Sequence, residues 1–316
     1  MARLVDKVRP TNRKKSYITA QLNLYNNCSI LLPMSEDVIS YYSEVFPKLK
    51  KFLKNREIAT KTYLKDMDFI KRGSHEPPLY INELIKNVNK KFIELREGDS
   101  HLKDVKSKLN KTQIKIWEYF VPRRLIALHY AVNKEHPNKP IDRICFDIDR
   151  KNLPAEKAQV VALKLIETIK KDSSFNLKYK VFTMWTGNSF HIYLFLNKKI
   201  PPSYYVRYIH AELNNSKDSF TNKWATQINK ELKTIKVIAG HEKKEGFINI
   251  DPSLTPSGKI SRCPFSLYIK KYNKISGISL PLSIDELQDK NLINKLRSYN
   301  KEKVLKNLDY LSKKIP

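Results

Sequence analysis

The sequence predicts an α/β (α+β) fold with a split βαβ core, in which a mixed sheet is embedded in helical N-terminal and C-terminal segments. Two observations lead to this prediction. Apolar residues recur at helical spacing near the N-terminus, and from residue 125 short β-branched and aromatic runs alternate with helical patterns. The order of these patterns is strand, helix, strand, strand, helix, strand. We expect a mainly helical part at residues 1–124, a core at 125–280 and a helical tail at 281–316.

The N-terminal part should begin with a flexible basic arm, because residues 1–15 lack apolar periodicity. A helix is predicted over residues 35–58, with Ser35 as its cap and a break or kink at Pro47. Its apolar positions are Val38, Tyr41, Tyr42, Val45, Leu49 and Phe52. Residues 81–119 are also helical in character, and their high charge suggests that they face solvent.

The core contains four predicted strands. Residues 143–149 alternate an apolar face with a face that carries Cys145, Asp147 and Asp149. A helix follows Pro154, and two further strands, residues 178–185 and 189–196, are joined by a Thr-Gly-Asn turn. A helical passage over residues 201–232 leads to the last strand, residues 246–251.

The charge balance indicates a polyanionic partner. The 316 residues include 60 Lys and Arg but only 32 Asp and Glu, which gives a net charge of +28. Nucleic acid is the first candidate and an acidic membrane surface the second, although an AT-rich genome would also raise the lysine content. The sequence contains no apolar run long enough to span a bilayer and no apolar stretch typical of a signal peptide. We therefore expect a cytoplasmic protein without a membrane partner, associated with the nucleoid if the source is prokaryotic.

The cysteines restrict the kind of metal site. Cys28, Cys145 and Cys263 are far apart and form no C-x-x-C pair, so neither a zinc site nor an iron-sulfur cluster is predicted. Any metal ion must then be held by oxygen ligands.

Asp147 and Asp149 are the first candidate site residues. Carboxylates at i and i+2 on a strand point the same way, about 7 Å apart along the backbone, and can converge on hard cations such as Mg²⁺ or Mn²⁺. The alternative is a D-x-D pair that merely ends a strand at the surface. Burying Asp147 after an apolar half-strand without a cation would be costly, which favours the metal site.

Two later segments carry further candidates. Ser189 and His191 follow the Gly-Asn turn on one strand face and offer donors suited to a triphosphate, although a lone histidine is more often structural. Asp251 ends the last strand and could join the first two carboxylates in a two-metal site. Downstream, Lys259, Arg262 and Lys270 surround Ser266 with charge suited to phosphate, with a basic surface hairpin as the alternative.

Taken in order, FDID, TGNSFH and INID with a downstream R-C-P-F-S-L resemble the three motifs of the archaeo-eukaryotic primase superfamily. Upstream, the segments YYSEVFPKLKKFLKNRE and RRLIALHYAVNKEHP are similar to parts of archaeal primase small subunits. The resemblance covers roughly residues 40–272. It implies a catalytic core with an RRM-like sheet, and a DNA-directed primase or polymerase that synthesises primers on single-stranded DNA from nucleoside triphosphates with two Mg²⁺ or Mn²⁺ ions.

The resemblance also assigns roles. It implies that Asp147, Asp149 and Asp251 bind the metals, with Asp251 also orienting a 3′-hydroxyl. It further implies that Ser189 and His191 bind the incoming triphosphate. Arg262, with Lys259, Ser266 and Lys270, would also meet phosphate, and a primase large subunit or another replication protein would be a further partner. Template strand would lie on the basic, aromatic-interleaved stretches 42–72 and 115–130.

Three departures from the superfamily pattern leave the branch open. Ser189 stands at the second glycine of the turn, and Tyr268 stands at the final histidine of S-L-H. The zinc-binding knob of the small subunit is missing. The short spacing resembles minimal single-chain primases, and equally the polymerase domains attached to bacterial end-joining ligases. A gap-filling polymerase that needs a primer, an inactive nucleic-acid-binding accessory protein and a metal-dependent nuclease therefore stay as alternatives.

Overall fold

The structure is a computed structural model that describes residues 37–64, 67–73, 76–97, 101–136, 138–211, 219–242, 244–270 and 274–316. Residues 37–316 form one compact unit. The predicted basic arm, Ser35 and Cys28 lie outside the described residues. In the described part of the chain, no helix has the length and apolar character needed to cross a bilayer.

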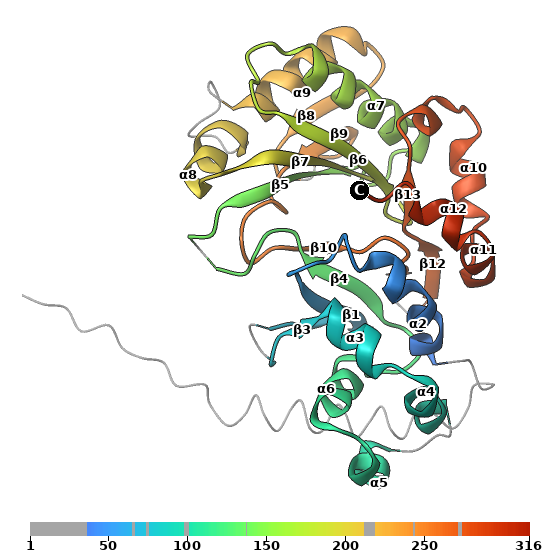
Figure 1. The fold of residues 1–316 in the computed structure, drawn as a ribbon. Helices are drawn as coiled ribbons and strands as arrows, with labels where there is room; N and C mark the ends of the chain where they lie inside the picture. Colours follow the sequence, from blue (N-terminus) through green and yellow to red (C-terminus); the bar gives the residue numbers. More distant parts are fainter. Residues whose placement is uncertain are drawn as a thin grey trace, which may run out of the picture. The chain divides into compact units, whose positions relative to one another are not determined.

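A sheet of six strands forms the centre of the fold (Figure 1). All neighbouring strands are antiparallel except β8 and β9, which are parallel. In spatial order the strands are β13 (Leu280–Leu282), β6 (Tyr179–Trp185), β7 (Phe190–Ile200), β5 (Ile141–Asp149), β9 (Phe247–Asp251) and β8 (Lys236–Ala239).

Four of these strands have the split βαβ topology. Along the chain, β5 is followed by α7 (Ala155–Lys171), β6, β7, α9 (Phe220–Glu231) and β9. In space the first of these strands lies between the fourth and the third, and α7 and α9 pack against each other on one side of the sheet (Figure 1). The predicted fold class is confirmed. Strands β8 and β13, which extend the sheet at its edges, were not predicted.

A second sheet lies within the segments that flank this core. Strand β1 pairs with β2, β3 and β4, and β4 also pairs with β10. The strands are β1 (Glu57–Leu64), β2 (Met67–Lys71), β3 (Leu79–Tyr80), β4 (Ala127–Ala131) and β10 (Ile260–Arg262). A separate hairpin follows, made of β11 (Leu267–Lys270) and β12 (Lys274–Ile278).

The predicted helix over residues 35–58 is too long. Helix α2 (Val38–Leu49) begins at an Asp37 cap, whose Oδ1 accepts a hydrogen bond from the Ile39 amide at 2.9 Å. It continues through Pro47 and ends two residues later, before a turn in which Asn55 has a φ of 58°. Residues 57–64 then pair in β1, where the alternating β-branched side chains suit a strand.

Residues 81–119 are helical as predicted, in several short pieces. Their helices are α3 (Ile81–Asn87), α4 (Lys90–Glu97), α5 (Leu102–Val105), the 3₁₀ turn Lys106–Lys108 and α6 (Lys111–Tyr119). The expectation that this region only faces solvent is wrong, because the Phe92 and Arg96 side chains are fully buried. Arg96 forms an ion pair with Asp37, 2.9 Å from Nε to Oδ2, which ties α4 to the start of α2.

The remaining helices lie at the end of the core and in the tail. After β7 come α8 (Pro202–Tyr204) and a π-helical turn, Tyr205–Ile209. The tail holds a 3₁₀ turn, Asp285–Gln288, and α10 (Leu292–Arg297), α11 (Lys301–Lys306) and α12 (Leu308–Ser312). This agrees with a helical C-terminal segment, while the part boundaries at residues 124 and 280 stay a prediction.

Candidate active site

Strand register brings the three predicted aspartates to one face of the large sheet. Asp147 on β5 lies directly opposite Asp251 on β9, and Asp149 lies opposite Asn249. Directly opposed residues share a face, with Cβ atoms about 5 Å apart, and residues two apart along a strand share it as well. The Phe146 ring on β5 packs against Trp224 of α9, with 5.9 Å between the ring centroids, so the next residue, Asp147, projects from the face that α9 does not cover (Figure 1).

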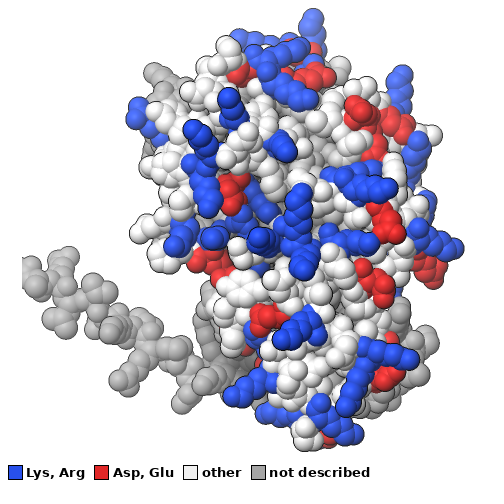
Figure 2. All heavy atoms as spheres, viewed as in Figure 1, with Lys and Arg blue, Asp and Glu red and all other residues white. Residues whose placement is uncertain are grey.

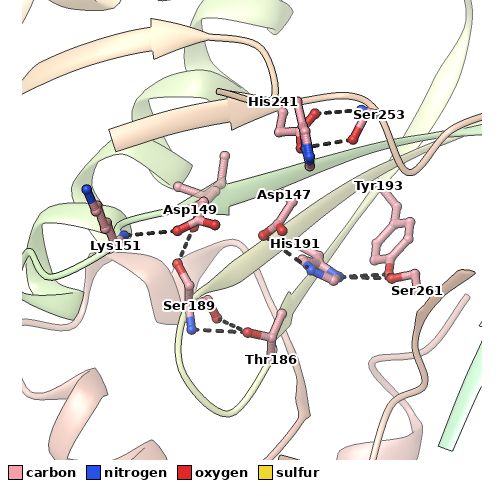
Figure 3. Close-up of polar contacts among 12 residues, drawn as sticks. Asp147, Asp149, Lys151, Thr186, Ser189, His191, Tyr193, His241, Ser253 and Ser261 are labelled. Carbon is pink, nitrogen blue, oxygen red and sulfur yellow. Dashed lines mark hydrogen bonds and ion pairs between the residues drawn. The ribbon is translucent and has the colours of Figure 1, made fainter. Parts of the chain in front are cut away.

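The carboxylates of Asp149 and Asp251 form hydrogen bonds with neighbouring groups. Asp251 accepts hydrogen bonds from the Ser253 amide at 2.8 Å and the Ser253 hydroxyl at 2.9 Å, and its Oδ2 lies 2.9 Å from Nδ1 of His241 (Figure 3). Asp149 accepts from the Lys151 amide at 2.9 Å. As these side chains stand, the described residues contain no group of three or more His, Cys, Asp or Glu arranged to hold a metal ion.

His191 lies next to this carboxylate pair. It is opposite Asp147 across β7 and β5, with its Nε2 atom 3.4 Å from Oδ1 of Asp147. On the other side of the ring, Nδ1 lies 3.1 Å from both the Tyr193 hydroxyl and the Ser261 hydroxyl. Those two hydroxyls are 2.7 Å apart (Figure 3). The Tyr193 and Ser261 hydroxyls therefore hold the ring at Nδ1, and Nε2 faces Asp147.

The turn before His191 is tightly closed. The Thr186 amide donates to the Ser189 carbonyl at 2.8 Å, and the Ser189 amide donates to the Thr186 hydroxyl at 3.1 Å. Gly187 has a φ of +93°, which favours glycine. The Ser189 hydroxyl is buried and donates to the carbonyl of Ile148 on β5. Since a hydroxyl oxygen can also accept, it keeps the capacity to receive a hydrogen bond.

Of the four basic and hydroxyl candidates downstream, the three whose side chains are described lie in different surroundings. Ser266 is fully buried, where its hydroxyl accepts from the Leu128 amide at 2.8 Å and contacts the Leu267 carbonyl at 3.2 Å. Lys259 is exposed, and the side chain of Lys270 lies outside the described residues. Arg262 is near enough to Asp147 to interact with it electrostatically: burial lowers the pKa of Arg262, while neighbouring tyrosines and the Asp147 carboxylate act in the opposite direction.

Comparison with known proteins agrees with this geometry. The chain matches the family described as "LigD, primase-polymerase domain" over residues 35–312. The chain belongs to this family. The predicted resemblance to the primase superfamily is thereby confirmed at the level of the primase-polymerase domain.

The fold of this family member is also seen in a solved structure. The polymerase domain of Mycobacterium tuberculosis Ligase D, determined in complex with DNA, matches with a TM-score of 0.53 and 14% sequence identity. The match covers 88% of this chain and 92% of that chain. No curated protein matches the chain in sequence.

One buried histidine beside Arg262 was not among the candidates predicted from the sequence. His129 on β4 is buried and lies opposite Arg262 on β10. Burial first, and then the positive charges of Arg262 and Lys61, hold the pKa of His129 well below its ordinary value, so the ring is neutral at pH 7. Its position in the alternating run ALHYA was the available signal, but a histidine on an apolar strand is no sign of a site by itself.

The surface of this family member is rich in basic side chains. Figure 2 shows Lys and Arg spread over the visible face, with a group across its middle and fewer acidic side chains between them. This distribution suits the phosphate backbone of a nucleic acid.

Proposed function

We propose that the chain is a template-dependent nucleotidyltransferase that adds nucleotides to the 3′ end of a nucleic-acid strand on a DNA template. The observation that carries the proposal is the register of β5 and β9, which puts three carboxylates and the His191 ring on one sheet face. The family match supports the same reaction class.

The chemistry of the three aspartates fits divalent cations. Carboxylate oxygens are the ligands that Mg²⁺ and Mn²⁺ prefer. Asp147, Asp149 and Asp251 would hold two such ions after turning from their present hydrogen-bond donors. When bound, the ions would supply Lewis acidity to a 3′-hydroxyl and to the leaving pyrophosphate.

The neighbouring side chains have roles in binding and orientation. His191 would contact the triphosphate through Nε2, since Nδ1 is held by Tyr193 and Ser261. Ser189 would accept or share a hydrogen bond beside it. Arg262 would supply positive charge to the phosphates, and Lys259 would act from the exposed rim. Lys270 stays a candidate from the sequence, and the enclosed Ser266 hydroxyl is better suited to holding β4 against β11.

Two readings of the reaction fit this site. In the first, the enzyme extends an existing primer, as in gap filling or end joining, and the match to a primase-polymerase family is compatible with this reading. In the second, it also starts primers, as the motif resemblance to a minimal archaeal primase small subunit suggests. Starting a primer requires an additional site for the first nucleotide, and a large subunit would be one source of such a site.

Binding of single-stranded DNA is the other part of the proposal. The structural neighbour is a polymerase domain in complex with DNA. In this chain, one of the stretches predicted to meet template contains the β1–β2 pair, where the Lys61 ammonium lies 5.2 Å from the Tyr63 ring centre and Lys71 lies 6.0 Å from that of Phe69. Such pairs combine a phosphate contact with a surface for base stacking.

A primer-extension assay tests the function. A labelled oligonucleotide on a longer template is incubated with Mg²⁺ or Mn²⁺ and either ribonucleotides or deoxyribonucleotides, and a second reaction contains template without primer. Longer product only with primer supports the first reading, and product from template alone supports the second. A shortened oligonucleotide would indicate a nuclease, and binding without any change of length would indicate an accessory protein.

A further inference from the structure

The turn between β6 and β7 is held by a side chain from another strand. Arg150 directly follows the last residue of β5, and its guanidinium donates from Nε to the Asn188 carbonyl at 2.8 Å. From Nη2 it donates to Oδ1 of the same asparagine at 2.6 Å. Its third nitrogen, Nη1, donates to the Leu153 carbonyl. One planar group thus joins the end of β5 to the turn that precedes His191.

The same turn also packs closely against the β11–β12 hairpin. A Cβ atom placed on Gly187 would lie 2.4 Å from Cβ of Tyr268, and one placed on Gly277 would lie 2.8 Å from the Gly187 carbonyl oxygen. The turn therefore has little room to move toward the hairpin. Arg150 holds the turn at a further point, through both oxygens of Asn188, the residue between Gly187 and Ser189.

We infer that Arg150 is a positioning residue, which fixes residues 186–189 and through them the Ser189 hydroxyl and the His191 ring. Asn188 immediately precedes Ser189, so a shift at Asn188 moves the Ser189 hydroxyl from its contact with Ile148. The inference rests on the proposed function, because it assumes that these two side chains bind the nucleotide.

The planar, forked geometry of the guanidinium allows Arg150 to make these three hydrogen bonds at once. The three groups that Arg150 contacts are uncharged oxygens, so its charge alone does not explain the contacts. A lysine at this position would keep the charge but could not reach two acceptors of Asn188 and the Leu153 carbonyl in one plane. Arg150→Lys therefore separates position from charge.

The kinetic test compares Arg150→Lys and Arg150→Met with the wild type in primer extension. We expect both variants to raise the KM for nucleoside triphosphate about tenfold, because the triphosphate contacts are displaced before chemistry begins. The Kd for primer–template should stay within about twofold. Loss of folded protein alone would lower the apparent kcat and the melting temperature and would leave KM unchanged.

A second measurement does not depend on catalysis. Amide hydrogen exchange of the segment 186–191 reports directly on how firmly the turn is held. Both Arg150 variants should speed its exchange about tenfold, while exchange in the β5 core stays the same. Asn188→Ala, which removes one of the two acceptors but keeps the carbonyl, should give a smaller change of the same sign.

Arg207→Lys is the matched control, since Arg207 lies in the π-helical turn Tyr205–Ile209 and its guanidinium lies 5.0 Å from the centre of the Tyr208 ring. It should leave KM and exchange unchanged. Wild-type KM and wild-type exchange in Arg150→Lys would overturn the inference, and so would unchanged exchange in Arg150→Met. Absence of nucleotide incorporation by the wild type would refute the proposed function instead, and the exchange measurement would still decide the role of Arg150 in the turn.

Discussion

Asp147 and Asp251 lie directly opposite each other on the antiparallel strands β5 and β9. Two like charges at opposed positions of a sheet repel each other and weaken the pairing. Ser253 and His241 are within hydrogen-bond distance of Asp251, but neither lies between the two carboxylates' own strands as a bound cation would. A cation between the two carboxylates would relieve it, so the pair links metal binding to stability.

Asp251→Asn should therefore have opposite effects on stability and activity. Without metal, the melting temperature should rise by a few degrees, because about 1 kcal/mol of repulsion is removed. Primer extension should fall at least about 100-fold, and so should that of the Asp147→Asn, Asp149→Asn double variant. Differential scanning fluorimetry with and without Mn²⁺ and a gel extension assay measure the two effects.

Single-stranded DNA binding should be nearly unchanged in these variants, which a fluorescence anisotropy titration checks. Asp309→Asn is the control, because this aspartate is 85% exposed and pairs with Lys48 far along the chain. It should alter neither Mn²⁺ response nor extension. A wild type whose melting temperature ignores Mg²⁺ and Mn²⁺, or an active double variant, would contradict the metal site.

Gly187→Ala should damage the turn that carries Ser189. An alanine would be strained at a φ of +93°, and its Cβ would lie 2.4 Å from Cβ of Tyr268. We expect a loss of about 1–3 kcal/mol in the free energy of unfolding, with a higher KM for nucleotide. Urea unfolding and extension kinetics measure the two quantities.

Gly246→Ala separates the two causes, since Gly246 also has a positive φ, +78°, but nothing lies within 4 Å of its Cβ position. It should show the backbone strain and leave the nucleotide KM unchanged. If both variants lose the same stability, contact with Tyr268 has no measurable effect.

The site was predictable from the sequence where local patterns determine geometry. Alternation along residues 143–149 put Asp147 and Asp149 on one face, and the turn residues placed Ser189 and His191 at the start of the next strand. The opposition of Asp147 and Asp251, by contrast, depends on which strands become neighbours. The motif resemblance supplied that information, because spacing along the chain does not contain it.

Predictions from the sequence were wrong where contacts between residues far apart in the chain determine the structure. The helix predicted over residues 35–58 ends at Leu49, and its last two predicted residues, Glu57 and Ile58, belong to β1, which pairs with β4. Ser266 was predicted to contact phosphate, but its hydroxyl accepts a hydrogen bond from the Leu128 amide. The contacts of His129 and Arg150 likewise depend on distant segments, since His129 lies opposite Arg262 of β10 and Arg150 donates to Asn188 in the turn before β7.

Asp37→Asn should strongly destabilise the N-terminal helices. Asn is as good a helix cap as Asp, so the Ile39 amide keeps its acceptor, while the negative charge and the acceptor for Arg96 Nε are lost. Arg96 is fully buried, and removing its carboxylate partner leaves an unpaired charge. We expect the free energy of unfolding to fall by about 3–5 kcal/mol, measured by urea unfolding.

Replacing both members, as in Asp37→Asn with Arg96→Met, should recover part of that loss, because no uncompensated charge stays buried. This account would be contradicted if the double variant lost more free energy of unfolding than the two single variants lose when their losses are added. The contacts of Arg96 with the Trp117 and Phe120 carbonyls are lost in it too, so full recovery is not expected.

His129 should make the stability of the protein depend on pH below neutrality. Its pKa is held well below the ordinary value of about 6.5, chiefly by burial, so in that interval the unfolded chain binds a proton that the folded chain does not. Stability must then rise with pH inside this window and fall as the pH drops below about 6.5, by at most about 1.4 kcal/mol per pH unit.

His129→Gln removes the proton site, so the difference between wild type and variant in urea midpoints at pH 7.5, 6.5 and 5.5 isolates this residue from the other histidines. Parallel pH profiles for the two proteins would show that His129 titrates normally in the folded state, whereas a wild-type loss that the variant lacks would show that the ring is kept neutral beside Arg262.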